Sequence, residues 1–102
     1  MNTTDDREWV SLEAYCTGSH VELSFIESLE ENGLVQVIVR ESHRFLPVDQ
    51  LPQLDRLVRL HEDLGINVEG LGAITHMLER MAAMQDEMNQ LRNRLRRFGP
   101  LA

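Results

Sequence analysis

The most regular pattern of apolar and polar positions lies between Ile74 and Phe98, where apolar residues recur at alternating spacings of three and four. This heptad spacing puts them on one narrow seam of a helix, and polar residues occupy the remaining faces. The seam positions are Ile74, Met77, Met81, Met84, Met88, Leu91, Leu95 and Phe98. Because a narrow apolar seam is usually buried against another helix, we predict a long C-terminal helix over 67–98 that pairs with a second copy of the chain.

Other interpretations of this seam stay open. The helix could instead fold back on its own domain, with methionine as an adaptable filler. The orientation of a dimer is also open: Glu87 could meet Arg92 of a parallel partner, whereas Arg80 and Arg94 would lie unfavourably in some antiparallel alignments. A methionine series packs a core far more often than it binds a soft metal, so we expect no metal site.

Two short helices are predicted near the start of the chain. Ser11 can cap the first helix, and Thr17-Gly18 supplies its break, because Gly18 can adopt a positive φ. Ser19 can cap the second helix, which stops at Asn32-Gly33. Two short helices joined by a turn that contains glycine form a helix-turn-helix pattern.

A β-hairpin and a third helix are expected next. Residues 34–40 alternate in strand-forming types, Glu41-Ser42 offers a turn, and residues 43–48 return as a second strand, so that the pair forms a wing. Pro47 should confine the return strand to a sheet edge. A third helix follows and ends at Gly65, after which Asn67 can cap the long C-terminal helix.

These elements divide the chain into four parts. We expect a flexible N-terminus at 1–8, a winged helix-turn-helix domain at 9–66, the long dimerisation helix at 67–98 and a tail at 99–102. The predicted fold class is therefore mainly α, with a small β-hairpin wing and a long C-terminal coiled-coil helix.

Size and composition narrow the class of protein. The 102 residues suffice for one small domain and the long helix. A single cysteine, Cys16, excludes a disulfide within the chain. We expect a cytoplasmic protein without a membrane partner, because no apolar export segment opens the sequence and no run is long enough to span a bilayer.

Charge is distributed unevenly along the chain. Residues 1–50 hold ten acidic residues against three arginines, so the whole formal charge of −7 lies in this half. Residues 51–102 hold equal numbers of both signs, and the chain contains no lysine. This distribution argues against nucleic acid as a partner and favours a basic protein surface.

The acidic residues of the second helix are its most distinctive feature. With Ile26 at the centre of the buried side, a helical wheel puts Glu27 and Glu31 outward and Glu22 and Glu30 at the borders. A helix that reads DNA would carry Arg, Lys, Asn or Gln on this face. The alternative is a solvated face that only keeps the protein soluble.

Catalytic motifs are absent from the sequence. The histidines at 20, 43, 61 and 76 are dispersed without the spacing of metal ligands. The sequence has neither a glycine-rich phosphate loop nor a nucleophile elbow. We therefore expect no enzyme, no catalytic residues and no cofactor.

The predicted order of helix, turn, helix, wing, helix and long terminal helix resembles MerR-type proteins. Within that group the chain is most similar to the chaperone-modulator branch, CbpM, and the similarity runs from about Trp9 onward. The stretches that resemble it are 15–18 (YCTG), 30–35 (EENGLV), 57–66 (LVRLHEDLGI) and 91–98 (LRNRLRRF). One difference lies at the turn into the second helix, where members of the branch can carry a run of acids and this chain has Ser19-His20-Val21.

The resemblance implies a small cytoplasmic bacterial protein that binds the J-domain of a DnaJ-like co-chaperone, CbpA, and inhibits its co-chaperone and DNA-binding activities. Glu22, Glu27, Glu30 and Glu31 would meet the basic helix of the J-domain, and Arg40 and Arg44 of the wing would reach acidic positions on it. Two alternatives remain. One is a MerR-type transcriptional regulator that binds DNA, and the other is an assembly or scaffold dimer unrelated to chaperones.

Overall fold

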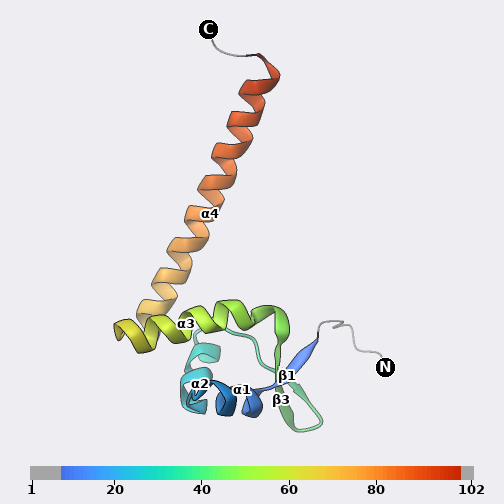
Figure 1. The fold of residues 1–102 in the computed structure, drawn as a ribbon, viewed down its shortest axis with the longest axis vertical. Helices are drawn as coiled ribbons and strands as arrows, with labels where there is room; N and C mark the ends of the chain where they lie inside the picture. The colour runs from blue at the N-terminus through green and yellow to red at the C-terminus, as the bar shows by residue number, and fades with distance from the viewer. Residues whose placement is uncertain (1–7, 100–102) are drawn as a thin grey trace. The chain divides into compact units, whose positions relative to one another are not determined.

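The computed structural model of the protein describes residues 8–99. Its elements follow in the order β1 (Trp9–Ser11), α1 (Leu12–Ser19), α2 (Leu23–Glu31), β2 (Ile38–Arg40), β3 (His43–Pro47), the 3-10 turn η1 (Val48–Gln50), α3 (Leu51–Leu64) and α4 (Val68–Arg97) (Figure 1). The predicted mainly helical class, with a small sheet and a long C-terminal helix, is confirmed. Apart from Glu8 and Gly99, the flexible start and the tail that we expected lie outside the described residues.

The chain forms two units, one ending at Gly72 and the other beginning at Ala73. The first unit contains the sheet, α1 to α3 and the first turn of α4, and the second contains the rest of α4. Among residues 8–99, no helix combines the length and the apolar character needed to cross a membrane.

Three short strands form an antiparallel sheet in which β3 lies between β1 and β2. The hairpin of β2 and β3 turns at Glu41 and Ser42, both with positive φ. The strand β1 was not predicted, so the expectation that Pro47 limits β3 to a sheet edge was wrong. Pro47 is the last residue of β3 and pairs with Trp9, while the ladder is continued by the Val48 N–H, which donates to the Glu8 carbonyl at 2.8 Å.

The turn between α1 and α2 differs from its prediction. Ser11 caps α1 as expected and accepts a hydrogen bond from the Ala14 N–H at 3.2 Å. The helix then continues through Gly18, and His20 takes the left-handed conformation instead, with φ 57°. Ser19 is still helical, so it does not cap α2. The physical reason is tertiary: the later turn buries Val21, which is 7% exposed.

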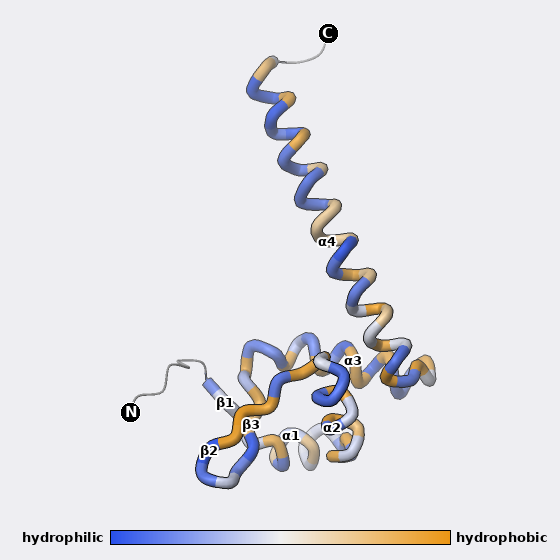
Figure 2. The backbone as a smooth tube through the Cα atoms, turned by 180° about the vertical axis from the view of Figure 1, so that it is seen from behind, coloured by the Kyte–Doolittle hydropathy of each residue, from blue (hydrophilic) through white to orange (hydrophobic). Residues whose placement is uncertain are grey.

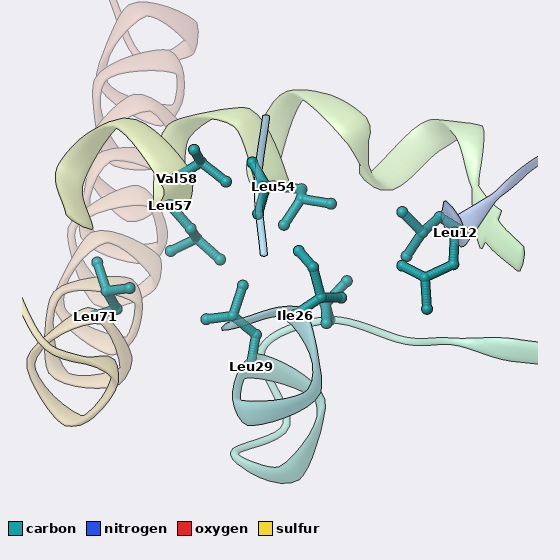
Figure 3. Close-up of a cluster of buried hydrophobic side chains, with 10 residues drawn as sticks. Leu12, Ile26, Leu29, Leu54, Leu57, Val58 and Leu71 are labelled. Carbon is teal, nitrogen blue, oxygen red and sulfur yellow. The ribbon is translucent and has the colours of Figure 1, made fainter. Parts of the chain in front are cut away.

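The core of the first unit lies between α3 and the pair α1 and α2. Figure 3 shows Leu54, Leu57 and Val58 of α3 facing Ile26 and Leu29 of α2. Complete burial of one such side chain contributes about 1.5–3 kcal/mol relative to exposure. Leu71 of α4 is also fully buried, so the first turn of this long helix belongs to the core of the domain.

The C-terminal end of α3 and the start of α4 follow their predictions. Gly65 terminates α3 with φ 68°. The Asn67 side chain accepts a hydrogen bond from the Gly70 N–H at 2.8 Å, so Asn67 caps α4 as expected. From this point α4 continues to Arg97, with apolar positions recurring along it (Figure 2).

Candidate protein-binding face

The exposed side of α2 carries the acidic residues of interest. Ile26 and Leu29 are fully buried in the core, which turns the opposite side of the helix to solvent. Glu22, Glu30 and Glu31 are exposed, and their side chains form no hydrogen bond or ion pair with other residues between 8 and 99. We call these three residues the acidic face.

Glu27 lies in a different environment from its three neighbours. Arg44 of β3 donates a hydrogen bond from Nη1 to Glu27 Oε2 at 3.1 Å, and the two side chains are 37% and 46% exposed. The helical wheel placed Glu27 outward, but the wing covers this edge of α2 and partly buries the carboxylate. A pair this exposed contributes roughly 0–1 kcal/mol. Its main consequence is that Glu27 already has a cation within the chain.

Both arginines of the wing contact other side chains of the domain. The Arg40 guanidinium lies 5.2 Å from the centroid of the Trp9 ring, a cation–π geometry, and Arg44 pairs with Glu27. Trp9 also packs against Phe45, with ring centroids 5.7 Å apart. The contacts of Trp9 could not be predicted because they depend on β1, and the Arg44–Glu27 pair depends on how the wing packs against α2. Arg44 thus offsets the charge of Glu27, while Glu22, Glu30 and Glu31 remain as exposed negative charges.

A hollow that the sequence did not reveal adjoins the acidic face. It lies where the start of α2 meets the end of α3, and its lining includes Glu22 and Glu62. The rings of Phe25 and His61 stack there with centroids 4.4 Å apart. No local motif joins these residues, because the contact forms only when the two helices pack.

Two partly buried side chains, Tyr15 and Cys16, have raised pKa values. Tyr15 donates its hydroxyl hydrogen to Asp55 at 2.8 Å, and burial, followed by this carboxylate, raises the pKa of Tyr15. Burial likewise raises the pKa of the Cys16 thiol, which disfavours the reactive thiolate. Within the described part of the chain, no group of three or more His, Cys, Asp or Glu residues is arranged to hold a metal ion.

The predicted heptad seam forms one exposed stripe on α4 and extends to Phe98, just beyond the helix. Its residues from Met77 onward are between 48% and 83% exposed, and Ile74 is partly buried. A hollow of about 410 Å³ on this stripe is bounded by apolar side chains of Met84, Met88 and Leu91. In the part of the second unit that the structure describes, no element other than α4 is present, so the apolar stripe stays exposed.

Comparison with known proteins identifies relatives of the whole domain and most of α4. The family model described as MerR HTH family regulatory protein matches residues 10–93. Among curated proteins, the chain is similar to the chaperone modulatory protein CbpM of Pseudomonas entomophila strain L48, with 27% identity over 90 residues. It is 28% identical to CbpM of Pseudomonas putida strain F1 over the same length. Each alignment covers 87% of this chain and 89% of the relative. No solved structure matches the chain significantly.

Proposed function

The chain belongs to the MerR HTH family of regulatory proteins. Within that family, we propose that it is a chaperone modulator that binds the J-domain of a DnaJ-like co-chaperone related to CbpA. In this proposal it inhibits the co-chaperone and DNA-binding activities of that partner, and it acts as a cytoplasmic binding protein with no catalysis of its own. The similarity to proteins named chaperone modulatory protein supports a role of this kind.

The observation that carries the proposal is the acidic face. In a DNA reader the corresponding helix of the helix-turn-helix enters the major groove, where carboxylates would be repelled by phosphates. Here Glu22, Glu30 and Glu31 are exposed without internal cations, whereas Arg40 and Arg44 are engaged within the domain. Such a face complements a basic helix of a protein partner.

The mechanism follows from competition for one surface. A J-domain uses a basic helix and the adjacent loop to engage an Hsp70-type chaperone. If the acidic face occupies that helix, the chaperone ATPase cannot be recruited at the same time. Opposite charges on the two surfaces would also accelerate their encounter, since electrostatic steering raises association rates.

We also propose that the heptad seam pairs with the seam of a second copy. A single helix in water is only marginally stable, and the described part of the second unit contains no other element to cover its apolar stripe. A second copy supplies the same heptad pattern, and its apolar side chains can fill the hollow bounded by Met84, Met88 and Leu91. Each dimer would then carry two acidic faces.

The alternative function is a DNA-binding transcriptional regulator, which the family description favours. It would require cations on α2 or the wing that are available to phosphates. The acidic face and the engaged wing arginines make this candidate weaker than the chaperone modulator.

An ATPase assay tests the proposed inhibition. The co-chaperone stimulates ATP hydrolysis by its Hsp70-type partner, and addition of this protein should return the rate to its unstimulated level. The basal rate of the chaperone alone serves as the control and should not change. Full stimulation in the presence of excess protein would contradict the proposed function.

A further inference from the structure

The hollow beside the acidic face has a volume of about 420 Å³. Its lining consists of His20, Val21, Glu22, Phe25, His61 and Glu62. These residues come from the end of α1, the start of α2 and the last turn of α3, so the hollow is a product of helix packing within the first unit.

One part of its lining is a fixed pair of rings. The Phe25 and His61 rings are nearly parallel, with an interplanar angle of 22° and centroids 4.4 Å apart. His61 Nδ1 donates a hydrogen bond to the Ile66 carbonyl at 2.8 Å, which holds the ring and leaves Nε2 as an acceptor in the neutral imidazole. Rings held in this way form a preorganised platform for a flat cation.

Two carboxylates reach the same hollow from separate parts of the chain. Glu22 precedes α2 and Glu62 belongs to α3. Both residues are exposed, and neither side chain has a hydrogen-bond or ion-pair partner in the range 8–99. Glu22 occupies the N-cap position of α2 but makes no capping hydrogen bond, so its carboxylate is available to an external donor.

We infer that this hollow receives an arginine side chain of the partner protein, an inference that rests on the proposed function for the identity of that partner. Arginine combines an apolar stem with a planar cation that carries five N–H donors. The guanidinium plane can lie on the ring stack while Glu22 and Glu62 accept its hydrogen bonds. A lysine ammonium would gain the charge attraction but not the stacking of two planes.

The arginine would act differently from the other basic residues of the partner. Exposed Glu30 and Glu31 attract positive charge over a distance and therefore affect mainly the association rate. A side chain enclosed between two carboxylates and an aromatic platform loses water and contributes more to the lifetime of the complex. We therefore expect the hollow to act as an anchor that slows dissociation, and Glu30 and Glu31 to raise the association rate.

A titration without any partner protein tests the chemistry of the hollow. The full chain, labelled with ¹⁵N, is titrated with N-acetyl-arginine amide, and the neutral isostere N-acetyl-citrulline amide is the control. We expect amide shifts that cluster at Val21, Phe25, His61 and Glu62 with the arginine compound only. Dispersed shifts, or equal shifts with citrulline, would overturn the inference.

A matched pair of double variants tests the role of the hollow in the complex. Glu22→Gln with Glu62→Gln and Glu30→Gln with Glu31→Gln each remove two exposed acids, so the change in net charge is the same. Loss of charged hydrogen bonds should weaken J-domain binding by about tenfold or more in the first variant, mainly through faster dissociation, and by only about threefold in the second. Thermal unfolding of both variants checks that the domain stays folded.

Equal losses in the two variants would mean that only net charge matters, and the hollow would not be an anchor. If the unaltered protein fails to bind the J-domain, the proposed function is refuted, while the arginine-amide titration still decides whether the hollow binds a guanidinium.

Discussion

His20, rather than Gly18, is the residue that turns the chain at the end of α1. It has a φ of 57°, whereas Gly18 is helical and a Cβ built on it would meet no atom within 4 Å. Glycine is the usual residue in a left-handed position, which is why the sequence predicts the turn at the wrong place. Burial of Val21 outweighs that local preference.

The position of this turn has a measurable effect on stability. Gly18→Ala should raise the free energy of unfolding by about 0.5–1 kcal/mol, because alanine loses less conformational entropy in a helix. Gly65→Ala is the matched control, and since Gly65 has a φ of 68° it should lower the same quantity by about 1–2 kcal/mol. Urea unfolding of both variants measures the difference. Equal destabilisation by the two would mean that α1 ends at Gly18.

Local and tertiary information also differ in what they reveal about the candidate binding residues. Glu22 precedes α2. The exposure of Glu31, and of Glu30 at the border of the buried side, follows from helical periodicity, which a sequence displays directly. The pairing of Glu27 with Arg44 does not, because it depends on how the wing packs against α2. The Phe25–His61 stack is equally hidden, since its rings belong to separate helices.

At the scale of elements, α2 is the part of the domain that should recognise the partner. Glu30→Lys with Glu31→Lys should slow association with the J-domain, because it removes negative charges that attract the basic surface of the partner. The association rate should also depend less on salt between about 50 and 300 mM, since salt screens this attraction. Stopped-flow measurement of the association rate at several salt concentrations gives both quantities.

Glu79→Lys with Asp86→Lys is the control for this experiment, since it makes the same change in net charge on α4. The control should change the association rate much less than the α2 variant. An α2 variant that associates at the original rate, with the original salt dependence, would exclude the acidic face from recognition.

The elements that could be predicted from the sequence are marked by a long periodic pattern or by a capping residue next to the helix. The heptad pattern of α4 and the caps at Ser11 and Asn67 are such signals, and the structure contains all three. The strand β1 covers only Trp9–Ser11, which is too short for alternation to be recognised. Without β1, neither the central position of β3 nor the partner of Arg40 could be inferred.

At the scale of the whole molecule, the heptad seam should determine the oligomeric state. Met84→Glu with Leu91→Glu places charges on the seam and should convert a dimer into a monomer, because buried like charges oppose helix pairing. Sedimentation velocity measures the change. Asn89→Glu with Asn93→Glu adds the same charge on the polar faces of α4 and should leave the dimer intact. A protein that is monomeric before any substitution would contradict the proposed pairing.

We propose above all that a helix-turn-helix domain with an acidic α2 recognises a basic protein surface. Calorimetric titration of the purified protein with the J-domain of its own CbpA-like co-chaperone, and in parallel with duplex DNA, tests this claim most directly. We predict saturable binding to the J-domain that weakens as salt rises, and no binding to DNA. Binding to DNA without binding to the J-domain would contradict the account and support a transcriptional regulator.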